Sequence, residues 1–462
     1  MDSALEYIHS FPRFNGRTGI KPGLERMEAI LQRLGNPHHS LRFVHVAGTN
    51  GKGSTCAYLA KMLQACGYRV GLYTSPYISQ FSDRMSINGK EIDEDTLHLL
   101  VEKVKPHIEA ICRTPMGEPT EFEVVTLLAI LFFAREGVDM VVWETGLGGR
   151  LDATNVVHPL ISVITNVALD HMHILGSTVS EIAAEKAGII KPGVPVVTAA
   201  DGEALHVIMN KAQEQKCDIY VYGTDFISHR TKYDWDGQWF TYNGLQRVWN
   251  DVSISMLGEH QCINASVALA VMEVLEAKGI LSIDRQALLE ALLQTRWPGR
   301  LEKIGKRPLI LLDGAHNPHG AHALARSLKE LLNGQRLIVV LGILEDKVVP
   351  ELIEPWLSLA KSIIVTEPET PRRADAEQVM QLIKRLLENA PSLHQEEAEH
   401  AAVTTFPADI QLLIERNVSD ACLHACTLAG MHDVVLVTGS LFTISEARRF
   451  LLAQWGEPVS ST

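Results

Sequence analysis

The stretch "FVHVAGTNGKGSTCAYLAKML", residues 43–63, decides the fold of this chain. Its apolar start predicts a buried strand over residues 43–47, and the pattern after the glycines predicts a helix. Gly48, Gly51 and Gly53 allow a tight turn between the two, and the amides that open the helix would point toward an anion. The stretch therefore predicts a strand–loop–helix unit that binds phosphate.

The polar residues of this loop supply the chemistry that a bound triphosphate requires. Lys52 provides a positive charge for the terminal phosphates, and Ser54 or Thr55 provides a hydroxyl that can bind Mg²⁺. The standard loop, G-x-x-x-x-G-K-[ST], has its hydroxyl directly after the lysine, whereas Gly53 is inserted here. The alternative is a glycine-rich turn with an incidental lysine, but the strand and the helix on its two sides favour the phosphate loop.

The composition indicates a globular protein with an acidic balance of charge. The 42 basic residues against 55 acidic ones give a net charge of −13. This charge argues against nucleic acid or an anionic membrane as the main partner, because both require a basic face. An anionic substrate must therefore meet locally placed cations.

The sequence predicts a cytoplasmic protein with no membrane partner. The start "MDSALEYIHSFPRF" lacks the basic, apolar and small-residue regions of a signal peptide. The most apolar run, "VVTLLAILFFA" (124–134), is too short to span a bilayer and predicts a buried helix. The 7 scattered cysteines, without a C-x-x-C pair, fit buried thiols in a reducing compartment better than disulfides or a zinc site.

Strand-like and helical segments alternate through most of the chain, which predicts an α/β fold with mostly parallel sheets. Between residues 219 and 257 aromatic and polar residues alternate around the turn Asp236-Gly237, which predicts a small antiparallel flap. Helical patterns follow from His260 to Lys278 and from Asp284 to Gln294. The strands expected outside the flap cover residues 43–47, 69–74, 139–144, 160–166, 194–199, 308–312, 336–342, 362–366 and 433–438.

The segment "TRWPGRLEKIGKRP" (295–308) is the expected domain boundary, because it is rich in proline, glycine and basic residues. A chain of 462 residues exceeds what one hydrophobic core usually serves. We therefore expect a phosphate-loop domain at 1–296 and a smaller, Rossmann-like α/β domain at 297–462.

Two further strand ends carry residues that can bind a metal ion. Glu144 ends the strand of "VDMVVWETGLGGRLDATN" (138–155), at the sheet edge where the phosphate loop also lies, and a carboxylate there can bind Mg²⁺ or its waters. Asp170 and His171 end the strand of "ISVITNVALDHMHILG", and a neutral imidazole can bind a metal. A single histidine after a strand is usually an ordinary loop residue, so the metal interpretation depends on convergence with Ser54 and Glu144.

Spacing alone gives simpler explanations for several neighbouring residues. Arg150 and Asp152 can pair with each other on a surface loop. Thr178 and Glu181 form a capping box that opens a short helix, on which Lys186 would be a solvated side chain.

The second domain contains a comparable strand end in "PLILLDGAHNPHGAHALARSLKELL". Asp313 and His316 lie in the turn between a strand and a helix. An acidic residue in this position can hold ribose hydroxyls, and a nearby histidine can stack on a base. The alternative is an Asx-type turn with no ligand.

Together these motifs resemble the folylpolyglutamate synthase/dihydrofolate synthase family, within the Mur-type ATP-dependent amide ligases. The resemblance runs in order over nearly the whole chain and implies an N-terminal domain of the Mur-ligase P-loop type. It is carried by "GLERMEAILQRLGNP", "HVAGTNGKGST", "YTSPYISQFSDRMSING", "ETGLGGRLDATNVV", "ITNVALDHMHILG", "EIAAEKAGIIKPG", "HQCINASVALAV", "WPGRLE", "LLDGAHNPHGA" and "VTGSL".

The resemblance implies a folate ligase that uses ATP and Mg²⁺, with the nucleotide between its two domains. The γ-phosphoryl group would pass to a substrate carboxylate, and the amine of L-glutamate would then attack the acyl phosphate. Activation is needed because a carboxylate is a poor electrophile. Catalysis by positioning and charge neutralisation suits Lys52 and the loop amides. The family is usually monomeric, so the expected partners are folate or dihydropteroate, L-glutamate and ATP.

Matching the motifs residue by residue implies a role for each candidate. Lys52, His171 and Lys186 are the candidates for catalysis. One Mg²⁺ would bind Ser54, Glu144 and His171, and carbamylation would turn Lys186 into a ligand for a second metal ion. Asp313 would lie on the ribose and His316 near the adenine. The candidate ATP contacts are Thr49, Asn50, Gly51, Lys52, Gly53, Ser54, Thr55, Asn264, Arg300, Asp313 and His316.

The resemblance also implies a mobile loop that helps to form the folate site. Phe122, in "EFEVVT", is the candidate to stack on the pterin. The family usually has Glu-Arg where this chain has Asp83-Arg84, and often His where it has Tyr77, so we expect fine-tuning of the folate contacts rather than their loss. The candidate folate contacts are Ser75, Pro76, Asp83, Arg84, Phe122, Arg150 and Asp152.

Two other functions share parts of this pattern. A peptidoglycan-type Mur ligase uses the same chemistry on a nucleotide-sugar substrate, but we expect its UDP-binding domain to need more than the residues before Gly48. A non-ligase P-loop switch would need the guanine-specific N-K-x-D, where this chain has "TNVALD", and would not explain "DGAHNP". The acceptor stays open, because no residue separates dihydropteroate from folates that already carry glutamate.

Overall fold

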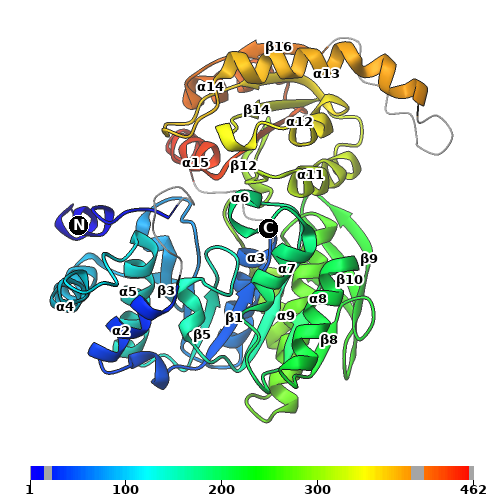
Figure 1. The fold of residues 1–462 in the computed structure, drawn as a ribbon. Coiled ribbons are helices and arrows are strands. Elements are labelled where there is room, and N and C mark those ends of the chain that lie inside the picture. Colours follow the sequence, from blue (N-terminus) through cyan, green and yellow to red (C-terminus); the bar gives the residue numbers. More distant parts are fainter. Residues whose placement is uncertain (1, 15–22, 397–409, 457–462) are drawn as a thin grey trace. The chain divides into compact units, whose positions relative to one another are not determined.

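The computed structural model describes residues 2–14, 23–396 and 410–456, which form two compact units (Figure 1). The first unit contains the chain up to Thr231, then Trp239–Ile254 and His260–Thr295. The second unit contains Lys232–Gln238, Ser255–Glu259 and the chain from Arg296 onward. The chain therefore passes between the two units several times.

An eight-stranded sheet forms the centre of the first unit, in the order β4-β3-β2-β5-β1-β6-β7-β8. The six strands from β2 to β8 in this order run parallel to their neighbours, whereas β3 and β4 are antiparallel at one edge. Parallel strands place their carboxyl ends at one edge of the sheet, so the loops after β1, β5 and β6 meet there. The strands are β1 (Phe43–Ala47), β2 (Val70–Tyr73), β3 (Met85–Ile87), β4 (Lys90–Glu91), β5 (Met140–Glu144), β6 (Ile161–Ile164), β7 (Val196–Thr198) and β8 (Ile219–Val221).

Helices pack on this sheet and form two clusters of buried hydrophobic residues with it. One of these clusters contains most of the buried residues of α5. The run 124–134 lies inside α5 and is buried, as predicted. The helices are α1 (Asp2–His9), α2 (Glu25–Arg33), α3 (Lys52–Ala65), α4 (Glu94–Cys112), α5 (Glu121–Glu136), α6 (Met172–Leu175), α7 (Val179–Ala187), α8 (Gly202–Glu214), α9 (Glu259–Ala277) and α10 (Arg285–Gln294), with short 3-10 turns η1 (Pro37–Ser40), η2 (Phe81–Arg84) and η3 (Ala153–Val156).

The predicted flap is a separate three-stranded sheet in the order β11-β10-β9. Its strands are β9 (Ile227–Asp234), β10 (Gly237–Asn243) and β11 (Val248–Ile254). The expected start of the flap at residue 219 was wrong, because β8 pairs with β7 in the main sheet. Main-chain pairing, rather than the aromatic character of the segment, decides which sheet β8 joins.

The second unit is built on a six-stranded sheet in the order β12-β13-β17-β14-β15-β16. All neighbours run parallel except β12, which is antiparallel to β13. The strands are β12 (Glu302–Lys306), β13 (Leu309–Leu312), β14 (Leu337–Leu341), β15 (Ala360–Val365), β16 (Gln411–Ile414) and β17 (Val434–Thr438). The predicted α/β fold with mostly parallel sheets is confirmed.

Helices pack on both faces of this sheet, where two hydrophobic clusters form the core. They are α11 (Pro318–Leu331), α12 (Pro350–Leu357), α13 (Ala376–Glu396), α14 (Val418–Leu428) and α15 (Leu441–Trp455), with the 3-10 turn η4 (Glu345–Lys347). Among the described helices, none combines the length and the apolar character that crossing a membrane requires.

Candidate active site

The phosphate-loop stretch forms the predicted strand, turn and helix. β1 leads into the turn, and α3 begins at Lys52 directly after Gly51, which has a φ of 83°. A side chain at Gly51 would be strained by this φ, and its Cβ would lie 2.5 Å from Asn264 Oδ1 on α9. Glycine therefore allows both the turn and the close approach of Asn264 to the loop.

Two lysines converge on one carbonyl oxygen of this loop. Lys52 Nζ lies 3.2 Å from Gly48 O and 3.3 Å from Thr49 O. Lys186 Nζ, from α7, donates to the same Gly48 O at 2.9 Å. Among the described residues, the hydrogen-bond partners of Lys52 are these two carbonyl oxygens. The ammonium of Lys52 is therefore held on the loop by carbonyl oxygens, without a carboxylate partner among the described residues.

Lys186 is buried with only 3% of its surface exposed, so the expectation of a solvated helix lysine was wrong. Burial, together with the charge of the nearby Lys52, lowers the pKa of Lys186 to about 7, although the charges of Asp170 and Asp152 oppose this shift. A large fraction of this amine is therefore uncharged at neutral pH, which is the form that can act as a nucleophile.

Ser54 is approached by a residue that sequence reasoning did not single out. Gln261, fully buried on α9, donates from Nε2 to Ser54 Oγ at 3.2 Å and accepts from Asn264 Nδ2 at 3.2 Å. The i, i+3 spacing of Gln261 and Asn264 in "HQCIN" was the available signal, because it places both on one helix face. The neighbouring Thr55 Oγ1 is buried and has no hydrogen-bond partner among the described residues.

The loop after β6 is tied to the phosphate loop by short polar contacts. Thr49 Oγ1 accepts from the Ala168 amide at 3.0 Å, and the Asn50 amide donates to Asn166 Oδ1 at 3.0 Å. Thr165 Oγ1 donates to Asn50 O at 2.7 Å. These bonds bring the segment that carries Asp170 and His171 against the phosphate loop.

His171 lies at the start of α6 in the left-handed region, with a φ of 49°. About a third of its side chain is exposed (35%), and its Nε2 lies 3.9 Å from Asp170 Oδ1. The imidazole is therefore accessible from solvent, as a metal ligand must be before the metal binds.

Glu144 ends β5 between β1 and β2 and is almost completely buried. Its Oε2 accepts from the Ser75 amide at 3.0 Å, which brings this loop residue to the metal-ligand candidate. Each carboxylate oxygen has two lone pairs, so an oxygen that accepts a hydrogen bond can also bind a cation.

The candidate folate loop is organised around Asp83. One oxygen, Asp83 Oδ2, accepts from the three amides of residues 78–80 at 2.6–3.2 Å. The guanidinium carbon of Arg84 lies 5.1 Å from the centre of the Tyr77 ring, which is a cation–π contact. Asp83 therefore shapes the loop, while Arg84 and Tyr77 form its side-chain surface.

Phe122, near the start of α5, lies beside the turn after Glu144. A Cβ added to Gly146 would overlap the Phe122 ring, and the ring centre lies 6.2 Å from that of Tyr73. Arg150 and Asp152 do not pair with each other, so that alternative was wrong. Arg150 Nη2 binds Glu185 Oε1 at 2.7 Å, whereas Asp152 is buried and accepts from the Leu147 amide at 2.8 Å.

The candidates of the second unit gather around the turn at Gly314. Asp313 Oδ1 accepts from the Ala315 amide at 2.9 Å, which is the Asx-type turn that we had considered as the alternative to ligand binding. A Cβ on Gly314 would lie 2.7 Å from Arg300 Nη1, and His316 Nδ1 lies 2.8 Å from Gly314 O. Burial raises the pKa of Asp313, and the charge of Arg300 opposes this rise. Arg300, Asp313 and His316 therefore lie close together.

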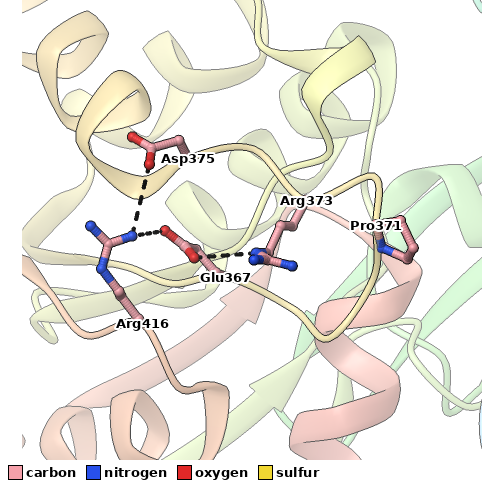
Figure 2. Close-up of a pocket in the computed structure, with 5 residues that line it drawn as sticks. All are labelled: Glu367, Pro371, Arg373, Asp375 and Arg416. Atoms are coloured by element: carbon pink, nitrogen blue, oxygen red, sulfur yellow. Dashed lines mark hydrogen bonds and ion pairs between the residues drawn. The ribbon is translucent and has the colours of Figure 1, made fainter.

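The second unit also contains a cavity of about 360 Å³, lined by arginines and carboxylates (Figure 2). Three of its neighbouring carboxylates, on Glu367, Asp375 and Glu377, lie within 4.8 Å of one another. Arg416 pairs with all three, at 3.8 Å from Asp375, and Arg373 Nε lies 3.4 Å from Glu367 Oε2. The two guanidinium groups offset most of the charge of the three carboxylates, and Arg416 connects the segment after β16 to the start of α13.

Comparison with known protein families defines the class of protein. Residues 46–272 match the family model described as Mur ligase middle domain. Residues 299–441 match the model described as Mur ligase, glutamate ligase domain. The two matched domains are thus those of the Mur ligases.

Individual relatives narrow the assignment. Dihydrofolate synthase/folylpolyglutamate synthase of Bacillus subtilis is 39% identical over 450 residues, which are 97% of this chain and 98% of the relative. Folylpolyglutamate synthase of Mycobacterium tuberculosis, solved with ADP and AMPPCP, has a TM-score of 0.85 and 29% identity over 97% of this chain and 98% of that chain. Escherichia coli FolC, solved with DHPP and ADP, has a TM-score of 0.82 and 28% identity over 98% of both chains. This chain belongs to the folylpolyglutamate synthase/dihydrofolate synthase family.

Proposed function

We propose that this protein is an ATP-dependent ligase that joins L-glutamate to folates through an acyl phosphate. The observation that carries the proposal is Lys52, whose ammonium is held by the carbonyl oxygens of Gly48 and Thr49 and has no carboxylate partner among the described residues. A triphosphate is the counter-anion that suits this arrangement. The names of the relatives supply the substrate class.

The reaction needs two displacements. A carboxylate oxygen of the folate attacks the γ-phosphorus of ATP, and ADP leaves with the electrons of the broken bond. The unprotonated amine of glutamate then attacks the acyl carbon, the C–O bond to phosphate breaks, and inorganic phosphate leaves while the nitrogen releases a proton to water or phosphate. Lys52 and the amides at the start of α3 neutralise and orient the phosphates, which is the main contribution of a protein to phosphoryl transfer.

The side chains at the carboxyl edge of the sheet are of types that can bind Mg²⁺. Ser54, Glu144 and His171 offer a hydroxyl, a carboxylate and an imidazole, and the unpartnered Thr55 hydroxyl offers a further buried oxygen. Mg²⁺ bound by these residues would balance the charge of the phosphates and polarise the γ-phosphoryl group.

Lys186 is the proposed site of a carbamate. Its uncharged amine can add to CO₂, lose a proton and become an anion with two oxygen ligands for a second Mg²⁺. The burial of Lys186 and the pKa of about 7 support this role, because an ordinary lysine is almost fully protonated at neutral pH.

The remaining candidates complete the proposal. Residues 1–296 would bind ATP, and residues 297–462 would serve the adenine and glutamate. Asn264 and Arg300 would contact phosphates, Asp313 the ribose and His316 the adenine. Folate would contact the loop of Ser75, Pro76, Asp83 and Arg84, together with Phe122, Arg150 and Asp152. The enzyme would be a cytoplasmic monomer with small-molecule partners only.

Substrate-dependent ATP turnover tests the proposed function. The purified protein is given ATP and Mg²⁺ alone, with a folate, with L-glutamate, or with both, while ADP and glutamate addition are measured. We expect stoichiometric ADP and amide formation only with both substrates. ADP formation without them would instead indicate a nucleotide switch. Dihydropteroate and tetrahydrofolate, offered in separate reactions, would identify the acceptor.

Matched variants connect this activity to the phosphate loop. Lys52→Met should reduce ligation by about 100-fold or more, because it removes a charge that stabilises the transferring phosphoryl group. Lys61→Met, on the exposed face of the same helix, should retain wild-type activity. Normal ligation by Lys52→Met would refute the proposed site.

A further inference from the structure

A chain of buried polar groups runs beneath the turn that follows Glu144. Asp152 Oδ2 accepts from the Leu147 amide at 2.8 Å, and Asp152 Oδ1 accepts from the amide and the hydroxyl of Thr154, with the amide at 3.1 Å. Thr154 Oγ1 lies 3.1 Å from His45 Nε2. His45 and Thr154 are completely buried, so the bonds between His45, Thr154 and Asp152 are made away from solvent, whereas the bond from the Leu147 amide is partly buried.

The hydrogen bonds in this series are all donated in one direction, from His45 toward Asp152. The Thr154 hydroxyl donates its proton to Asp152 Oδ1, so its oxygen accepts from the N–H at His45 Nε2. His45 Nδ1 then carries no proton, and it has no partner among the described residues. Burial lowers the pKa of His45 to about 3, so the ring stays neutral and keeps this direction at physiological pH.

Two neighbouring strands each supply a side chain that forms a hydrogen bond with Thr154. His45 on β1 and Trp143 on β5 are register partners in the parallel sheet. Trp143 Nε1 donates to Thr154 O at 3.0 Å, while His45 binds the hydroxyl of the same residue. The sheet core is thereby connected through Thr154 and Asp152 to the turn at residues 146–149.

This turn borders two parts of the proposed active site. At one end, Gly146 lies against the Phe122 ring, where a Cβ would overlap. At the other end, a Cβ on Gly149 would lie 2.8 Å from Glu185 O and 2.9 Å from Lys186 O. The turn therefore lies directly against the Phe122 ring at one end and against the backbone at the end of α7 at the other.

We propose that His45 and Thr154 are positioning residues that orient Asp152 and thereby fix the turn at residues 146–149 for folate binding. The folate part of this inference rests on the proposed function. Neither residue touches the reacting atoms. Their role is to orient the Asp152 carboxylate through buried hydrogen bonds. This carboxylate then accepts a hydrogen bond from the Leu147 amide. Loss of the Thr154 hydroxyl would remove one hydrogen bond from this carboxylate and leave the turn less ordered.

The test compares Thr154→Val, which keeps the shape but removes the hydroxyl, with Thr154→Ser, which restores the hydroxyl. In Thr154→Val we expect the folate KM to rise about tenfold, the ATP KM to stay within about twofold, and the amides of Gly146 and Leu147 to exchange hydrogen about tenfold faster. Thr154→Ser should restore all three quantities to near wild type. His45→Gln, which can still donate an N–H, should resemble Thr154→Ser.

A matched control is Thr198→Val, because Thr198 is a buried threonine of the same sheet whose hydroxyl donates to Ile164 O at 2.9 Å. It should change neither the folate KM nor the exchange of the Gly146 and Leu147 amides. Unchanged exchange at these amides in Thr154→Val would overturn the inference. If the ATP KM of Thr154→Val rose as much as its folate KM, the inference would also be overturned, because the variant would then have lost structure in general.

The exchange measurement needs no substrate, so it separates this inference from the proposed function. If the wild-type protein adds no glutamate to folates, the proposed function fails, while amide exchange still decides whether Thr154 fixes the turn.

Discussion

Lys186 shows how burial changes the chemistry of a single side chain. Its capping box and its position on a short helix predict a solvated lysine, yet α7 packs its end against the turn at residues 149–150. The approach is close because Gly188 has no side chain, and a Cβ there would overlap the backbone of Arg150. Removal from water then lowers the pKa of Lys186 to about 7 and makes its amine reactive.

Carbamylation of Lys186 should therefore depend on pH. Because the pKa is lowered to about 7, the uncharged amine becomes the major form as the pH rises through that value. Between pH 6 and pH 8 the uncharged fraction should increase from roughly a tenth to roughly nine tenths. Carbon-13 NMR with labelled CO₂ should show a carbamate signal that is larger at pH 8.

The Lys186→Arg variant assigns this signal, because a guanidinium stays protonated in this range. A carbamate signal of equal size in wild type and Lys186→Arg would show that the modification lies elsewhere.

At the scale of an element, the loop from residue 77 to η2 is held by two carboxylates, those of Asp83 and Glu91, rather than by a long helix or a strand. Asp83 gathers three amides of the preceding residues, and Glu91 accepts from Gln80 Nε2 at 2.7 Å and from the Ser82 hydroxyl. Such a loop has a defined shape without a helix or strand ladder. Asp83 thus contributes to the proposed folate site through the loop that it organises.

Asp83→Ala should weaken folate binding without loss of the fold. Three amides would lose their acceptor, and we expect the folate KM to rise about tenfold while the ATP KM is preserved. Steady-state kinetics with each substrate varied separately gives both constants. Asp93→Ala is the matched control, because Asp93 caps α4 through the Thr96 amide at 2.8 Å and lies outside this loop. A folate KM raised equally by both variants would contradict this role of Asp83.

At the scale of the whole molecule, the division into units does not follow the sequence order. The turn between β9 and β10 belongs to the second unit, although both strands are mainly assigned to the first. Within the second unit, Trp235 packs against the hydrophobic core and donates from Nε1 to Gln335 Oε1 at 3.1 Å, while Lys303 Nζ donates to Trp235 O. The second unit therefore needs a segment that precedes its main body by about 60 residues.

Trp235→Ala should destabilise the second unit by about 1–3 kcal/mol, because it removes a large, half-buried ring and leaves Gln335 without this donor. Thermal unfolding of the full chain, followed by calorimetry, should show a lower melting temperature. Tyr233→Ala, an exposed aromatic residue two positions earlier, is the control and should have a smaller effect. Equal losses in the two variants would argue against the packing role of Trp235.

Local patterns predicted much of the fold because they depend on neighbours in sequence. The strand before the phosphate loop, the buried helix at 124–134 and the capping box of Thr178 and Glu181 are all confirmed. The strands β3, β4, β12 and β16 were missed: β12 lies in the segment expected to be the domain boundary, and β4 and β16 are short strands at sheet edges. Edge strands bury little apolar surface, so their sequences carry only a weak alternating pattern.

The sequence by itself determined the phosphate loop, the alternation of strands and helices and the family motifs. Glycine placement and hydrophobic periodicity are patterns of residues that lie close together in the sequence, so they can be recognised without the structure. Only the tertiary structure decided that Lys186 is buried, that Gln261 binds Ser54 and that His45 reaches Thr154 across 109 positions. Burial and hydrogen-bond partners depend on which surfaces meet when the chain packs. Such contacts join residues far apart in sequence, and no local pattern records them.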